Sequence, residues 1–183
     1  MLDDLSAHLL DISQNSITAG ASKITVTMRD DDYFEFEISD NGKGMSEEQA
    51  ASVINPFITS RKTRRVGMGL PFLKQAAELC GGKFSLTSQL NVGTTVYASF
   101  NKSNIDMPPT GDIPASILTL LIDAPKIHWI FRYEKNNNTF EVDSKELEEA
   151  IDGLESLNSP DVALGLIEFL RNGINQTAEE ADN

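Results

Sequence analysis

Apolar and polar residues alternate along the chain with two different periods, and these periods predict its helices and strands. Apolar residues recur every three or four positions in three segments, which predicts helices at 2–17, 46–54 and 70–80. Strict alternation predicts four strands, at 24–28, 34–38, 84–86 and 96–100. Half-apolar strands and amphipathic helices in this order predict an α+β fold, a two-layer α/β sandwich over residues 1–100.

The pattern in the second half of the chain predicts a separate, smaller structural unit. The stretch NKSNIDMPPTGDIP at 101–114 contains proline, glycine and asparagine, which predicts a linker. Residues 115–183 then predict a small appended α+β C-terminal unit. Its expected elements are a helix near 117–121, a hairpin of strands at 127–133 and 140–142, a helix from 143 to about 157, and a helix from 160 to about 172, followed by a frayed tail. This unit could add strands to the first domain, bind a partner or form a homodimer.

Charge and composition exclude several classes of function. The net charge is −13, and residues 101–183 carry −10 of it, with 6 Lys or Arg against 16 Asp or Glu. General nucleic-acid binding needs a basic face, so we expect no nucleic-acid partner. No apolar run approaches the ~20 residues of a membrane span, and the N-terminus lacks the basic start of a signal peptide. With one cysteine, Cys80, which fits a reducing compartment, the chain is expected in the cytoplasm and not in a membrane.

Four polar or glycine-rich segments carry the candidate chemistry. Asp11 and Asn15 share one face of the first predicted helix, where a polar stripe is ordinarily the solvated side. Three glycine turns follow, DNGKGM at 40–45, VGMGLP at 66–71 and GTT at 93–95. Glycine allows close backbone approach, and a glycine-rich entry to a helix presents free N–H groups to a phosphate. Each segment alone is a weak indication, but four of them in this order support one another.

Taken together, these segments resemble the GHKL ATPase superfamily, which has the Bergerat fold and includes gyrase, heat-shock chaperones, histidine kinases and mismatch-repair ATPases. DISQNSITAGA resembles the N box, DNGKGM the first glycine box, NPFITSRK the lid of histidine kinases, GMGLP the second glycine box, and NVGTTVYASF the closing strand. The resemblance covers residues 1–100. No helix with a phosphoacceptor histidine precedes the N box, so the architecture resembles the stand-alone anti-sigma-factor serine kinases.

The resemblance implies that ATP and Mg²⁺ are bound, and it assigns roles to individual residues. Asn15 would supply an oxygen ligand to Mg²⁺, and Asp11, where the ATPases usually have Glu, would orient or deprotonate the attacking group. Asp40 would accept a hydrogen bond from the adenine amine, and Thr95 would reach adenine directly or through water. The remaining contacts to the nucleotide would come from Gly42, Gly44, Met45, Gly67, Met68, Gly69 and Leu70.

The basic run RKTRR at 61–65 has two interpretations. A basic run is usually a solvated loop. In the resemblance it belongs to the lid, where Arg61 or Lys62 would fold over the triphosphate, because guanidinium and ammonium groups suit phosphate.

Three functions are compatible with these residues. The first is an Mg-ATP-binding protein that transfers the γ-phosphate to Ser or Thr of a regulatory partner protein or hydrolyses ATP, without being a complete sensor histidine kinase. The alternative is an ATP-gated protein-binding switch with little or no catalysis. The third is a degenerate domain that no longer binds ATP, against which the retained Asn15, Asp40 and glycines argue.

Overall fold

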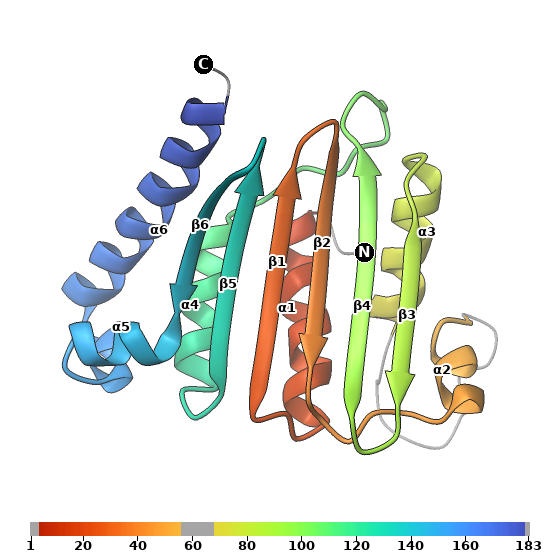
Figure 1. Cartoon of the computed structure of the whole chain (residues 1–183), viewed down its shortest axis with the longest axis horizontal. Coiled ribbons are helices and arrows are strands. Elements are labelled where there is room, and N and C mark those ends of the chain that lie inside the picture. Colours follow the sequence, from red (N-terminus) through yellow and green to blue (C-terminus); the bar gives the residue numbers. More distant parts are fainter. Residues whose placement is uncertain (1–3, 56–67, 182–183) are drawn as a thin grey trace.

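The computed structural model describes residues 4–55 and 68–181, which form two layers, a sheet and a row of helices (Figure 1). The helices are α1 Leu5–Thr18, α2 Glu47–Val53, α3 Gly69–Leu79, α4 Ile113–Asp123, α5 Ser144–Ala150 and α6 Pro160–Ala181, with a 3-10 helix η1 at Leu154–Asn158. The strands are β1 Lys23–Asp30, β2 Tyr33–Asp40, β3 Phe84–Gln89, β4 Gly93–Asn101, β5 His128–Lys135 and β6 Asn138–Asp143. The predicted two-layer α+β fold is confirmed.

The sheet joins both halves of the chain. Among the described residues it has six strands in the order β3-β4-β2-β1-β5-β6. β1 pairs antiparallel with β2 and parallel with β5, and the other neighbours are antiparallel. Because β5 and β6 follow residue 114, the C-terminal part of the chain continues the first sheet. Of the roles left open for residues 115–183, the addition of strands is therefore the one that the structure contains.

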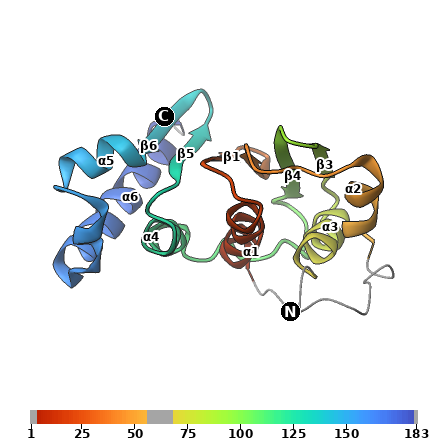
Figure 2. The ribbon, with the colours of Figure 1, turned by 90° about the horizontal axis from the view of Figure 1, so that it is seen from below.

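The core lies between the sheet and the helices on one of its faces. Figure 2 shows α3, α1, α4 and α6 side by side beneath the strands. Side chains alternate along each strand, so Ile24, Val26 and Met28 of β1 are buried in the same core as Leu9 and Ile12 of α1. Each such fully buried side chain stabilises the fold by roughly 1.5–3 kcal/mol. Because the apolar side of α1 faces this core, the polar side of the helix lies at the edge of the core.

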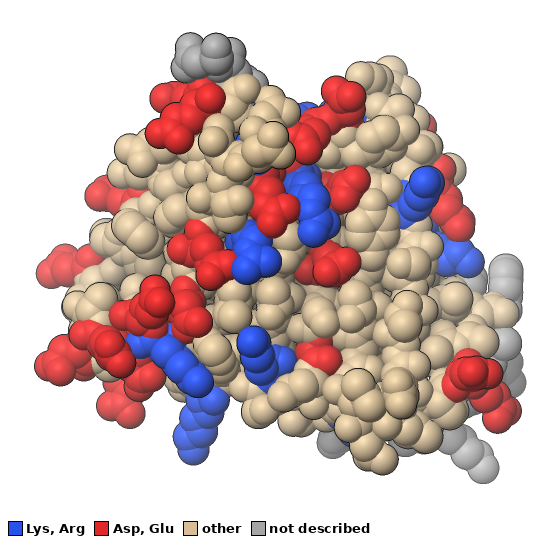
Figure 3. Space-filling view, in the orientation of Figure 1, with Lys and Arg blue, Asp and Glu red and all other residues tan. Residues whose placement is uncertain are grey.

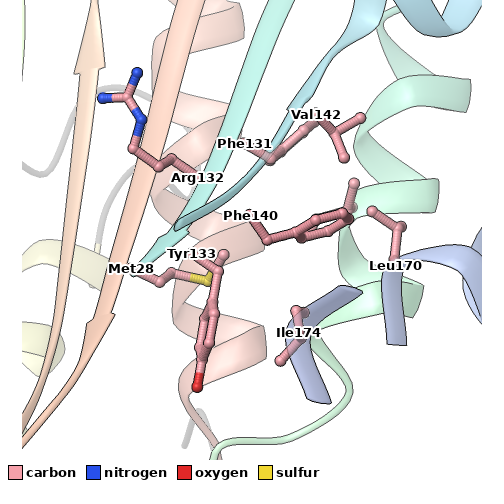
Figure 4. A pocket seen from close by; sticks show the side chains of 9 residues that line it. Met28, Phe131, Arg132, Tyr133, Phe140, Val142, Leu170 and Ile174 are labelled. Carbon is pink, nitrogen blue, oxygen red and sulfur yellow. The ribbon is translucent and has the colours of Figure 1, made fainter. Parts of the chain in front are cut away.

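The outer end of the core is closed by α6, which packs on β6 through an aromatic ring. Phe140 of β6 points toward Leu170 and Ile174 of α6 in Figure 4. Its ring also contacts Phe169 edge-on, with ring centroids 5.6 Å apart. A Cβ atom on Gly173 would lie 2.3 Å from the Phe140 ring, so the ring can approach α6 only because this residue has no side chain. Gly173 is therefore a packing requirement of the second half.

The other face of the sheet is open and carries charged side chains of both signs (Figure 3). Arg29 Nε of β1 donates a hydrogen bond to Glu134 of β5 at 2.9 Å, and Arg132 Nε donates to Glu141 of β6 at 2.7 Å. These side chains are partly exposed, so each pair contributes at most about 1 kcal/mol. These ion pairs join neighbouring strands on the exposed face of the sheet and do not form an apolar core.

The end of α5 differs from the prediction. The sequence predicts a helix from residue 143 to about Leu157, but α5 ends at Ala150. Asp152 and Gly153 have positive φ angles of 57° and 102°, and this left-handed conformation terminates a helix. At the other end of the helix, the Asp143 side chain acts as the cap by accepting a hydrogen bond from the backbone N–H of Lys145.

The end of α6 also differs from the prediction. The sequence predicts that the last helix stops near Asn172 and that the tail frays, but α6 continues to Ala181. Thr177 is buried, so packing against the rest of the chain continues beyond the predicted end. Tertiary packing, rather than propensity, supplies most of the stability of such a helix. Among the described residues no helix, α6 included, is long and apolar enough to cross a membrane.

We expect the same substitution to have opposite effects at the two glycines of α6. Gly165 is exposed, and an added Cβ would meet nothing within 4 Å, so Gly165→Ala should raise the free energy of unfolding by roughly 0.5–1 kcal/mol through helix propensity. Gly173→Ala should lower it by about 1 kcal/mol or more, because the methyl group overlaps the Phe140 ring. Urea unfolding of the two variants measures both effects. Equal shifts would contradict the packing of Phe140 on Gly173.

Candidate active site

The first part of the site is the polar side of α1. Asp4 caps this helix by accepting a hydrogen bond from the backbone N–H of Ala7, which sets where its turns begin. Asp11 and Asn15 lie one turn apart and are both half-buried. A solvated stripe would leave these side chains exposed. The half-buried position therefore favours a site over the ordinary solvated face.

The second part is Asp40 at the end of β2, whose carboxylate is held by two hydrogen bonds. The Ser16 hydroxyl donates to Oδ2 at 2.6 Å, and the backbone N–H of Gly42 donates to Oδ1 at 2.8 Å. Hydrogen bonds to an ionised acceptor are the stronger class, so they fix the orientation of this carboxylate. Sequence reasoning did not identify Ser16. The available signal was its place directly after Asn15, on the apolar side of the helix.

The turn after Asp40 is locked to the β3–β4 turn by its backbone. The N–H of Met45 donates to the Ser88 hydroxyl at 2.8 Å, and the N–H of Asn91 donates to the Lys43 carbonyl at 2.7 Å. Gly44 has a φ of 61°, and a Cβ there would lie 1.9 Å from the carbonyl oxygen of Gln89. Contact between these two turns therefore requires Gly44. Its predicted role beside adenine stays a prediction.

The strand register decides which threonine shares a face with Asp40. Asp40 lies opposite Thr94, whereas Thr95 lies opposite Ser39 and the two hydroxyls are 2.9 Å apart. Side chains alternate between the faces of a sheet, so Thr95 points to the open face and Thr94 to the face covered by α1. Thr95 thus lies on the face of the sheet away from Asp40, and its predicted contact with adenine stays a prediction. Thr94 lies two positions before the buried Val96, so the period-two pattern of its own strand places it on the covered face.

The third part is the contact between Asp11 and the first residue of α3. A Cβ on Gly69 would lie 1.5 Å from Asp11 Oδ2, so the carboxylate lies directly on the helix backbone. The N-terminus of a helix carries a partial positive charge that favours an anion there. Asp11 Oδ2 is nevertheless buried with no hydrogen-bond partner among the described residues, and this burial raises the pKa of Asp11. The site thus holds a carboxylate oxygen, Asp11 Oδ2, whose hydrogen-bonding capacity is unused among the described residues.

The other predicted contacts are only partly described. Met68 precedes α3 and is 46% exposed, and Leu70 is buried beneath the helix. Arg61, Lys62 and Gly67 lie outside the described residues, so both interpretations of the basic run remain predictions. Within the described part of the chain, no group of three or more His, Cys, Asp or Glu side chains could hold a metal ion.

Family comparison agrees with this geometry. The family model described as histidine kinase-, DNA gyrase B-, and HSP90-like ATPase matches residues 2–104, which include all three parts of the site. The chain belongs to this family and carries its ATP-binding domain. The predicted resemblance to GHKL ATPases is thereby confirmed.

Individual relatives are similar over part of their length. The sensor histidine kinase YvrG of Bacillus subtilis (strain 168) is 31% identical over 74 residues, which cover 38% of this chain and 13% of that protein. The virulence sensor protein BvgS of Bordetella bronchiseptica is 27% identical over 119 residues, which cover 60% of this chain and 10% of that protein. The chain thus spans about a tenth of the length of these two relatives.

A solved structure extends the similarity of fold into the second half. The MutL ATPase domain of Aquifex aeolicus, complexed with ADP, is similar with a TM-score of 0.57 and 15% identity. The similarity covers 85% of this chain and 70% of that one. This coverage exceeds the family match at residues 2–104, so it includes part of the strands and helices beyond the predicted linker. At this identity the likeness concerns the fold alone.

The contact between Asp11 and Gly69 predicts a non-additive pair of substitutions. Gly69→Ala should destabilise the wild-type chain by roughly 1–3 kcal/mol, because its methyl group would occupy the place of the Asp11 carboxylate. In an Asp11→Ala background the same substitution should cost much less, because that space is free. Urea unfolding of the four proteins of this double-mutant cycle gives the coupling energy. Additive effects would contradict the contact.

The raised pKa of Asp11 predicts a pH-dependent stability. The native state binds a proton more readily than the unfolded chain between 3.8 and the raised folded pKa, so wild-type stability falls as pH rises through this window. Asp11→Ala removes this loss and should be more stable than wild type near neutral pH, with the difference shrinking toward pH 3.8.

Asp4 provides a control of opposite sign. A hydrogen bond from Ser6 and another from the backbone of Ala7 lower its pKa, so it stabilises the fold above 3.8 and this stability is lost as pH falls through its folded pKa. Asp4→Ala should therefore cost stability near neutral pH. The urea unfolding midpoints of both variants and of wild type, measured from below pH 3.8 to neutral pH, test these expectations. If the midpoints of the two variants changed with pH in the same way, the opposite pKa directions of Asp11 and Asp4 would be contradicted.

Proposed function

We propose that this chain binds Mg-ATP between α1, the turn after β2 and the N-terminus of α3, and that it transfers the γ-phosphate to Ser or Thr of a partner protein. The observation that carries the proposal is Asp11 Oδ2, a buried carboxylate oxygen that lies on the first residue of α3 without a hydrogen-bond partner among the described residues. A buried, unsatisfied charge is costly, and such groups concentrate at functional sites.

Adenine would be recognised at Asp40. Ser16 and the Gly42 backbone hold its carboxylate in one orientation, and each carboxylate oxygen can accept a further hydrogen bond. An exocyclic amine can donate to this group, whereas a carbonyl at the same position would face a fixed negative charge. Thr94 lies on the same side of the sheet and is well placed to contribute a hydroxyl.

The phosphates would be held at the N-terminus of α3. The first backbone N–H groups of a helix have no partner within it, and they point toward an anion at this end. Asn15 offers a neutral amide oxygen, a suitable single ligand for a hard cation that keeps most of its waters. Mg-ATP, when bound, would supply the electrophilic γ-phosphate. The chain's own contribution is to orient the phosphates at this helix end, where Gly69 leaves room for the Asp11 carboxylate.

Asp11 would act as the proton acceptor. Its pKa is raised by burial, which brings the carboxylate closer to the pKa range in which a general base is efficient near neutral pH. A hydroxyl of a Ser or Thr side chain presented by the partner would donate its proton to the Asp11 carboxylate. If water takes this position instead, the same arrangement hydrolyses ATP.

A nucleotide-gated switch is the second candidate function, and the contact of Asp11 with Gly69 favours it. Asp is one methylene shorter than the Glu expected from the resemblance, and its carboxylate already lies against the α3 backbone. Bound nucleotide would then displace the end of α3 and alter the surface offered to a partner, with little phosphate transfer. A ligand shifts such an equilibrium only as far as its affinities for the two states differ.

The test is to incubate the purified chain with Mg²⁺ and γ-labelled ATP, with and without a cell extract. Asp11→Ala should lower phosphate transfer or release by roughly 10²–10⁴-fold while ATP still binds, as expected for a lost general base. Asp40→Ala should weaken ATP binding by about tenfold or more, because a charged hydrogen bond is lost. Asp32→Ala, at the exposed turn between β1 and β2, is the matched control and should behave as wild type.

The outcomes separate the two functions. Labelled protein bands or free phosphate that disappear in Asp11→Ala support the transferase or ATPase. ATP that is bound by wild type and lost in Asp40→Ala, with no phosphate moved, supports the switch. A wild-type chain that binds no ATP overturns both.

A further inference from the structure

Among the described residues, β6 is an edge strand of the sheet, so its outer side offers backbone groups that no neighbouring strand pairs. β5 and β6 are joined by Asn136 and Asn137, which have positive φ angles of 45° and 70°, as in a two-residue type I′ hairpin. In such a hairpin the residues flanking the loop are a hydrogen-bonded pair, and the pairs then alternate. The N–H and C=O groups of Thr139 and Glu141 therefore point away from β5. They form a short, regular edge to which another strand can add.

An apolar surface continues past this edge on α6. Figures 1 and 2 place α6 on the helix-covered side of β6 and extending outward beyond it. Phe169, which contacts Phe140 of β6, is 53% exposed on this helix, and Leu164 is 59% exposed. A strand added beside β6 would rest its inward side chains on Phe169, because Phe169 already packs against the inward side chain of β6. Burial of this ring would stabilise the added strand.

The surroundings of the edge are strongly acidic. Residues 136–171 contain nine Asp or Glu and two Lys or Arg, so they carry −7. Red side chains gather over α5 and the start of α6 at the lower left of Figure 3. The exposed carboxylates without a described ion pair include Glu146, Glu148, Glu149, Asp161 and Glu168. A field of one sign attracts a partner of the opposite sign and repels a second copy of the same chain.

We propose that the β6 edge binds an extended, basic segment of a partner protein, which adds a strand to the sheet and covers Phe169. Backbone hydrogen bonds to Thr139 and Glu141 would supply affinity, and alternate side chains would supply specificity. Apolar residues of the segment would face α6, and basic residues would face the carboxylates. The site is distinct from the nucleotide site, and it does not depend on the proposed function.

The test measures binding of a fluorescent peptide of alternating Lys and Val residues to the full chain without nucleotide, by anisotropy. Thr139→Pro removes the outward N–H while sparing the bonds to β5, and it should weaken binding by about tenfold, as should Phe169→Ser. Thr139→Ala keeps the N–H and should bind as wild type. Leu79→Ser, at an equally exposed apolar residue of α3, is the control for Phe169. Binding should weaken as salt rises.

Hydrogen exchange tests the same site without substitutions, which matters if Thr139→Pro fails to fold. The peptide should slow exchange at the amides of Thr139 and Glu141. Unchanged exchange there, or equal binding to a folded Thr139→Pro, would overturn the proposal in favour of charge attraction alone. Failure of the peptide to bind would also overturn it. A wild-type dimer that Thr139→Pro dissociates in sedimentation would assign the edge to self-association instead.

Discussion

The site depends on one constraint, the close approach of backbone segments at the end of β2. A side chain on Gly93 would lie 1.8 Å from the Asp40 carbonyl oxygen, and one on Gly44 would lie 1.9 Å from that of Gln89. The turn after Asp40 and the β3–β4 turn can meet only because both glycines lack side chains. Once they meet, the Asp40 carboxylate faces α1, where Ser16 can bind it. The orientation of a charged group thus follows from backbone packing.

Asp11 shows a different relation between stability and function. Its Oδ2 is buried without a hydrogen-bond partner among the described residues, and this burial raises the pKa of Asp11 and opposes folding near neutral pH. Natural proteins keep such groups where activity requires them, at a cost in stability. The dipole of α3 offsets part of this cost, and it would attract a phosphate to the same place. The position of Asp11 at the N-terminus of α3 is therefore the common cause of its proposed chemistry and of its cost in stability.

The second half of the chain changes what the family fold can present to a partner. Parallel pairing of β5 with β1 makes β1 an interior strand and moves the edge of the sheet outward to β6. The new edge lies in the acidic second half of the chain, whereas the predicted nucleotide site lies near α1 and α3. Binding of a partner and binding of a nucleotide would thus occupy different parts of one continuous sheet. Strands that share a sheet give the two sites a direct structural connection.

Local interactions could be determined from the sequence alone, and contacts between distant segments could not. The helical periodicity of residues 2–17 and the alternation of residues 24–28 and 34–38 involve neighbours within four residues, and the order of the glycine motifs indicated the family. Only the tertiary structure decided the register that selects Thr94, the bond from Ser16 to Asp40, the parallel pairing of β5, and the length of α6. Each of these depends on residues tens of positions apart, whose approach is set by packing of the whole core and not by local propensity.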